Sequence, residues 1–127
     1  MGFLQRHILR IDGSAGLIAG VIMWLLSDVL VALYQIPPWL FTINIMANLI
    51  YGISASLLAS RPHRPLGAVV ALSLANLLWA VLCIVTAMVI APTASIFGIG
   101  HFVGEGLFVG TLGVLEWRWR HALQRAH

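Results

Sequence analysis

Charged side chains are scarce in this chain of 127 residues, because they make up only 9% of it and lysine does not occur at all. Apolar residues make up 61% of the chain, and the mean hydropathy is +0.98. Soluble globular domains carry about 25% charged residues, so this composition excludes a fold that is surrounded by water. Hydrocarbon is therefore the expected main solvent of the side chains.

Cysteine and basic residues are also few. Cys83 is the single cysteine, so an intrachain disulfide is excluded and the redox compartment cannot be read from the sequence. The seven basic residues are all arginines in short clusters between apolar runs, which does not indicate nucleic-acid binding despite a pI of about 10. We predict membrane lipids as partners, and neither nucleic acid nor a cofactor.

Four long apolar runs cover most of the chain. We predict membrane spans at about residues 15–34, 40–59, 66–90 and 96–115. Each is close to the about 20 residues that a helix needs to cross ~30 Å of hydrocarbon, and turns that contain proline separate them. The predicted fold class is an all-α membrane protein, a four-transmembrane-helix bundle with up-down-up-down topology. Residues 1–127 form a single transmembrane domain in this interpretation.

Arginine occurs on only one side of the predicted topology. Arg6 and Arg10 precede the first span, Arg61 and Arg64 lie between the second and third, and the remaining arginines follow the fourth. Cytoplasmic loops carry an excess of basic residues, so we expect both termini and the middle loop in the cytoplasm. This topology predicts a multi-pass protein of the cell inner membrane. The use of arginine without lysine is typical of a GC-rich bacterial genome.

Glycine spacing predicts close helix packing. Gly16 and Gly20 form a small-xxx-small pair in the first span, and the fourth span contains Gly106 and Gly110 followed by Gly113. This second set lies on the side of its helix opposite His101 and Glu105. We therefore expect two contact faces on the fourth span, one toward the bundle and one toward a second copy or a larger membrane complex.

Ionisable side chains inside the predicted spans form the most informative pattern. A charge at membrane depth costs about 2.5–3.5 kcal/mol on insertion scales, so each one needs an explanation. Asp28, His101 and Glu105 fall in the outer half of the bilayer under the predicted topology, and the last two share one helix face at i, i+4 spacing. We predict that these three residues form a site that works as acid, base or proton relay.

Amide and aromatic side chains are expected to complete this site. Asn44 and Asn48 enter the membrane at the same depth on the second span, and Tyr51 continues their stripe. The third span adds Asn76 near mid-bilayer and Trp79 on the same face. We predict these five residues as the substrate-binding set.

Other interpretations of the ionisable residues stay open. Asp28 and His101 could form a buried pair that only orders the bundle. A metal is weakly indicated, because one histidine with two carboxylates resembles a facial triad but further ligands at that depth are missing. Haem is disfavoured because the other four histidines fall on the cytoplasmic side. Asp12 and Glu116 are expected to pair with arginines at headgroup level, where an ion pair contributes about 0–1 kcal/mol.

Short motifs carry a family resemblance. They are Arg10-Ile11-Asp12-Gly13 in the first span, Asn76-Leu77-Leu78-Trp79 in the third and Glu116-Trp117 at the end of the fourth. Together with the size and layout of the chain, they resemble a group of small bacterial four-helix membrane proteins, the DoxX-like families. The resemblance implies a four-helix membrane fold, and it implies no activity.

Three functions are consistent with these patterns. The first is an accessory or structural subunit that packs through its glycine-rich helix faces. The second is a proton-coupled transporter of a small molecule, and the third is a membrane enzyme that acts on a lipophilic substrate such as a quinone or isoprenoid. The second and third both use Asp28, His101 and Glu105. The sequence favours the first, because four short spans leave little volume for a gated path or a deep pocket.

Overall fold

A computed structural model gives the fold of residues 2–125, and within them the regular structure is entirely helical. The helices are α1 (Phe3–Leu25), α2 (Ser27–Tyr34), α3 (Pro38–Ala59), α4 (Leu66–Ile90), α5 (Ile96–Arg118) and the short 3-10 helix η1 (Ala122–Gln124). Four of them, α1, α3, α4 and α5, are long and apolar enough to span a membrane. The prediction of an all-α chain with four such helices is therefore confirmed.

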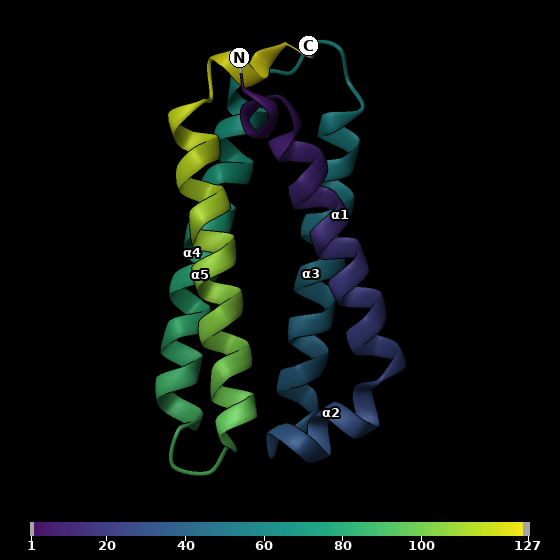
Figure 1. Cartoon of the computed structure of the whole chain (residues 1–127), viewed down its shortest axis with the longest axis vertical. Coiled ribbons are helices and arrows are strands. Elements are labelled where there is room, and N and C mark those ends of the chain that lie inside the picture. The colour runs from purple at the N-terminus through teal and green to yellow at the C-terminus, as the bar shows by residue number, and fades with distance from the viewer. Residues whose placement is uncertain (1, 126–127) are drawn as a thin grey trace.

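The first helix differs from its predicted span. It begins at Phe3 rather than near residue 15, and it ends at Leu25, where Leu26 leaves helical geometry with φ −103° and ψ 17°. Helix α2 then turns away and runs across the end of the bundle (Figure 1). Its last turn closes at Gln35, whose φ of 55° is left-handed, just before Ile36 and two prolines that cannot continue the helix.

The long helices associate as two pairs, α1 with α3 and α4 with α5. Most contacts between helices lie within these pairs, and few lie between them. Figure 1 shows the pairs side by side, with both chain ends at one end of the bundle, here called the terminal end; the opposite end is called the far end. Each pair is therefore a more tightly packed unit than the bundle that the two pairs form together.

Glycine makes the packing within each pair close. A Cβ on Gly16 would lie 2.8 Å from the backbone oxygen of Asn48, and one on Gly52 would lie 2.6 Å from the backbone nitrogen of Leu17. In the other pair, Gly106, Gly110 and Gly113 face α4 in the same way. The expected glycine-rich face of the fourth span thus exists, and it packs against α4 of the same chain.

Two connections join the helix pairs at opposite ends. At the far end, the Ser95 hydroxyl donates to the Leu33 carbonyl oxygen at 2.7 Å, and the Ser95 backbone N–H donates to Tyr34 at 2.9 Å. At the terminal end, the guanidinium of Arg64 donates to the carbonyl oxygens of Leu58 and Ala59 in α3 and of Leu123 in η1, at 2.9–3.1 Å. Arg64 therefore ties the end of α3 to the segment that follows α5.

Arg64 is buried although it lies in a loop. Its burial, followed by the charge of Arg10, lowers the pKa of the guanidinium, which nevertheless stays a cation because arginine is not deprotonated in proteins. Three carbonyl dipoles, two of them at the C-terminus of a helix, stabilise that charge.

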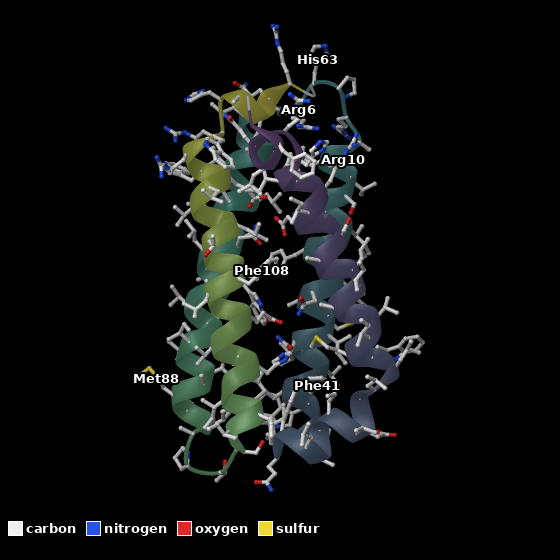
Figure 2. The ribbon with its side chains drawn as sticks, in the orientation of Figure 1. Arg6, Arg10, Phe41, His63, Met88 and Phe108 are labelled. Carbon is white, nitrogen blue, oxygen red and sulfur yellow. The ribbon has the colours of Figure 1, made fainter. Side chains whose placement is uncertain are left out.

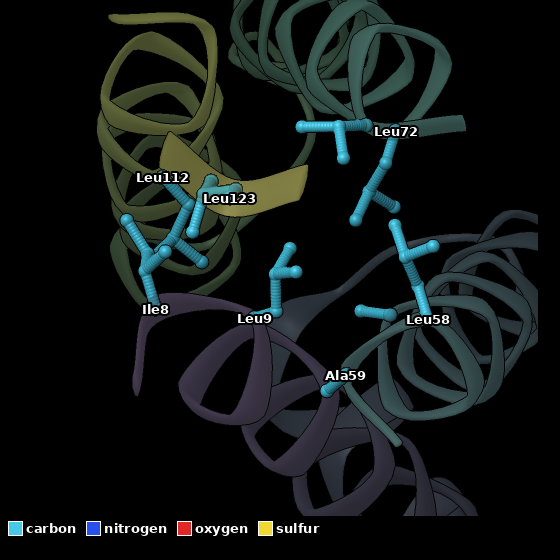
Figure 3. Close-up of a cluster of buried hydrophobic side chains, with 9 residues drawn as sticks. Ile8, Leu9, Leu58, Ala59, Leu72, Leu112 and Leu123 are labelled. Carbon is cyan, nitrogen blue, oxygen red and sulfur yellow. The ribbon is translucent and has the colours of Figure 1, made fainter. Parts of the chain in front are cut away.

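Apolar side chains close the bundle above and below its middle. Ile8, Leu9, Leu58, Leu72 and Leu112 meet from all four long helices at the terminal end, where Leu123 covers them (Figure 3). A second buried cluster at the far end contains Met23, Phe41, Ile45, Cys83 and Phe102. The buried polar residues Asp12, Asn48 and Asn76 lie between these two clusters.

Replacement of Gly52 tests the close packing of α1 on α3. Gly52→Ala should lower stability by about 1–3 kcal/mol, because the new methyl group meets backbone atoms that cannot move without separating the helices. Gly100→Ala is the matched control, since no described atom lies within 4 Å of a Cβ there, and it should be neutral or slightly stabilising. Thermal unfolding in detergent measures both; equal midpoints would contradict the packing.

Replacement of Arg64 tests the connection at the terminal end. Arg64→Gln should destabilise the protein by about 2–4 kcal/mol, because it leaves buried carbonyl groups without their charged donor. Arg61→Gln removes an exposed arginine from the same loop and should change stability by less than about 0.5 kcal/mol. Both values come from chemical unfolding in detergent, and a similar loss in the two variants would refute the structural role of Arg64.

Candidate functional site

The carboxylate of Glu105 is the centre of a hydrogen-bonded cluster between α3, α4 and α5. Asn44 and Asn48 of α3 donate to it at 2.7 and 2.9 Å, and the Trp79 indole of α4 donates at 2.8 Å. The thiol of Cys83 adds a contact of 3.3 Å to the same carboxylate. Four donors from two other helices therefore converge on one acceptor, which suits the ionised form of the side chain.

His101 extends this cluster toward α2. Its Nε2 lies 2.7 Å from Asn44 Oδ1, and its Nδ1 lies 3.3 Å from the Tyr34 hydroxyl. Because the Asn44 amide nitrogen donates to Glu105, its oxygen is the acceptor, so Nε2 carries the proton in this bond. When the ring is neutral, Nδ1 accepts from the Tyr34 hydroxyl, so both ring nitrogens are satisfied without a positive charge on His101.

Among residues 2–125, His101 is the only basic side chain at ion-pair distance from Glu105, with its Nε2 3.7 Å from Glu105 Oε1. With His101 neutral, the cluster keeps one net negative charge in the apolar part of the bundle. Such a charge costs about 2.5–3.5 kcal/mol at membrane depth, and hydrogen bonds to an ionised group return about 1.5–3 kcal/mol each. The donors therefore stabilise the charge without neutralising it.

Asp28 is not part of this cluster. Its side chain is exposed on α2, beside a shallow surface pocket that Trp24, Thr42 and Met46 also line, and it makes no ion pair or hydrogen bond with any residue from 2 to 125. The predicted meeting of Asp28 with His101 and Glu105 is thus not found, because the break at Leu26 turns α2 away from the axis of α1. The alternative pairing of Asp28 with His101 is not found either.

Asp12 and Glu116 form a second buried cluster, here called the Asp12 cluster. The amide nitrogen of Asn76 donates to Asp12 Oδ2 at 2.8 Å and to Glu116 Oε1 at 2.7 Å, so it links α1, α4 and α5. Asp12 is 5% exposed and Glu116 is fully buried. The prediction that both pair with arginines at headgroup level is wrong, because α1 begins at Phe3 and buries Asp12 inside the bundle.

A cavity of about 310 Å³, here called the central cavity, joins the two clusters. It lies between the two helix pairs, and its walls include Asp12 and Asn76 from one cluster and Asn48, His101 and Glu105 from the other. Apolar side chains make most of the remaining wall, and Phe108 reaches into the space between the pairs (Figure 2). The volume is at the lower end of the range for small-molecule sites.

All five residues of the predicted substrate-binding set reach this region. Asn48, Tyr51, Asn76 and Trp79 line the central cavity, and Asn44 is buried behind Glu105. Sequence reasoning missed Asp12 and Glu116 as members. A signal was present, since Glu116 lies eleven residues after Glu105, and three turns of helix bring such residues to the same face.

Metal and haem ligands are not gathered in the described part of the chain. No group of three or more histidine, cysteine, aspartate or glutamate side chains is arranged there to hold a metal ion. His7 lies near the start of α1, His63 lies between α3 and α4, and His121 lies beside η1. His127 lies outside the described residues.

Replacement of Glu105 tests the convergence of donors. Glu105→Gln should destabilise the protein by about 1–3 kcal/mol. The NH2 group of the new glutamine would face at least one of the N–H donors that now bond to the carboxylate, and two donors cannot bond to each other. Asp28→Asn makes the matched change at an exposed carboxylate and should leave the unfolding midpoint unchanged. The Trp79 contribution to tryptophan emission should shift only in the first variant; a shift in neither would count against the cluster.

No known family model, curated protein or solved structure matches this chain. The resemblance to DoxX-like proteins therefore stays a prediction, and the function has to be argued from the cavity and its two carboxylate clusters.

Proposed function

We propose that this protein is a proton-coupled carrier of small lipophilic cations. The observation that carries the proposal is a cavity between the two helix pairs that is lined by the carboxyl groups of Asp12 and Glu105. Glu105 brings to it a charge that neutral donors hold in place, and the nearest basic group, His101, is satisfied as a neutral ring. A bound organic cation would supply the missing positive charge.

The walls of the central cavity fit the apolar part of such a molecule. Tyr51, Trp79 and Phe108 supply aromatic rings, while Ala15, Gly16 and Ala19 leave room for a ligand. Aromatic rings attract cations by about 0.5–2 kcal/mol, with larger values where water is excluded. A carboxylate at one side and rings around it therefore select a compact cation with an apolar body.

Access from the membrane is proposed between α3 and α4, which share few contacts. A surface groove of about 380 Å³ lies there, lined by Ile43, Met46 and Ile50. Tyr51 and Trp79 line both this groove and the central cavity, with ring centroids 6.2 Å apart. Rotation of these two side chains would open the cavity toward the acyl chains, so a lipophilic molecule could enter without crossing water.

The two-pair architecture supports alternating access. Carriers commonly move by rocking one helix unit against another around a fixed central site. Here the glycine contacts hold each pair together, while the pairs meet through apolar side chains at the bundle ends and through the hydrogen bonds of the two carboxylate clusters between them. A change at Tyr34–Ser95 or at Arg64–Leu123 would open one end and leave the other closed.

We place the terminal end of the bundle on the cytoplasmic side of the inner membrane. Arg6, Arg10 and His63 gather at that end (Figure 2), and the arginines of the middle loop and of the C-terminal segment lie there too. The far-end connections contain no arginine. This distribution follows the excess of basic residues in cytoplasmic loops.

The other two hypotheses receive less support. The accessory-subunit hypothesis relied on the glycine-rich face of α5, and that face packs against α4. The enzyme hypothesis needs Glu105 as a general base, but hydrogen-bond donors already occupy both of its carboxylate oxygens.

Binding and transport of benzyltrimethylammonium test the carrier proposal. This permanent cation cannot cross a bilayer in a neutral form. Its uptake into protein-containing liposomes should therefore move protons out of the lumen, and an entrapped pH dye reports this proton release. The protein should bind the cation, and benzyl alcohol, an uncharged molecule with the same aromatic ring, should bind at least about tenfold more weakly, a difference of ~1.4 kcal/mol.

Three variants separate charge, space and surface effects. Glu105→Gln should abolish proton release by removing the charge, and Ala19→Leu should do so by filling the cavity with all charges retained. Asp28→Asn should behave like the wild type, because that carboxylate lies outside the cavity. Size-exclusion profiles establish that each variant is folded. Unchanged binding of the cation in both cavity variants would rule out this function.

A further inference from the structure

The Asp12 cluster has a feature that the Glu105 cluster lacks: two carboxyl groups share one amide. The single nitrogen of Asn76 donates to both Asp12 and Glu116, at 2.8 and 2.7 Å, so the carboxyl groups are held close together. Asn76 itself is only 1% exposed. Helices α1, α4 and α5 thus converge on this pair.

One oxygen of this pair is left without a donor. Glu116 Oε2 is buried and has no hydrogen-bond partner among residues 2–125, whereas both oxygens of Glu105 have one. Asp12 Oδ2 and Glu116 Oε1 also lie close to each other, because both accept from the same Asn76 nitrogen. Two ionised carboxylates held this close repel each other, and a proton on one of them removes the repulsion and supplies a further donor.

In the part of the chain that the structure describes, no arginine forms an ion pair with Asp12 or Glu116. Helix α4 presents the neutral Asn76 to both carboxyl groups. Arg10 of α1 and Arg118 of α5 are exposed. Asp12 lines the central cavity, and Glu116 does not.

We propose that Asp12 and Glu116 bind one proton between them and exchange it with the central cavity through Asp12. The proton moves along the hydrogen bond from the Glu116 carboxyl group to the Asp12 carboxylate, and from Asp12 it leaves into the cavity. The pair then carries two negative charges that only a cation in the cavity can balance. This inference rests on the proposed carrier function. It predicts that the carrier exchanges one proton for one monovalent cation, so that the exchange is electroneutral.

Infrared spectroscopy of the protein in liposomes tests the shared proton. A carbonyl stretching band of a protonated carboxyl group should be present at neutral pH without ligand. It should shift when all glutamates carry ¹³C in the carboxyl group or when all aspartates do, because the proton is shared between one residue of each type. These labels leave the protein unchanged, so absence of the band overturns the proposal whether or not any variant folds.

Variants assign the band to the pair. The double variant D12N/E116Q should lose it, while Asp28→Asn and Glu105→Gln should keep it, because these two carboxylates lie outside the pair. A band that persists in the double variant overturns the assignment. The assignment is supported if Glu105→Gln keeps the wild-type band and the double variant loses it.

Benzyltrimethylammonium connects the pair to transport. Addition of this cation to the wild type should reduce the band and release about one proton per bound cation. If the band is present and assigned but does not respond to the cation, the coupling is overturned and the proton site stands. If the cation is carried and releases protons but the band is absent, the carrier function stands and this inference fails.

Discussion

A buried carboxylate must find hydrogen-bond donors inside the bundle, and this requirement organises the structure. Hydrocarbon offers no donor, so Glu105 receives its hydrogen bonds from α3 and α4 while it projects from α5. The same requirement brings Asn76 of α4 between Asp12 of α1 and Glu116 of α5. Each long helix therefore supplies at least one polar side chain to a contact that crosses between helices.

Close glycine packing holds each helix pair together, away from the polar contacts between the pairs. Where α1 meets α3 at Gly16 and Gly52, the backbones approach each other within each pair. Dispersion contacts of this kind hold helices together in lipid, where the hydrophobic effect between them is absent. Because the closest packing lies within each pair, a cavity of about 310 Å³ remains between the pairs that a uniformly packed core would fill.

The two carboxylate clusters differ in how their charge is treated. Glu105 has enough neutral donors to remain charged, whereas the Asp12 cluster has one amide for two carboxyl groups and leaves an oxygen without a donor. One cluster is suited to attract a cation, and the other is suited to hold and release a proton. Because the central cavity touches both, a change in one charge alters the field at the other.

The sequence by itself determined the helical class, the four apolar spans and the shared face of His101 and Glu105, because length, composition and the 3.6-residue period are local properties. It also placed Asn48, Tyr51, Asn76 and Trp79 on polar stripes that reach the cavity. Only the tertiary structure decided which carboxylates share that cavity. A break at Leu26 that no proline or glycine marks turns Asp28 outward, and the early start of α1 carries Asp12 inward. Asp12 is held by Asn76 of α4 and the end of α2 is held by Ser95, and both contacts join residues far apart in the chain.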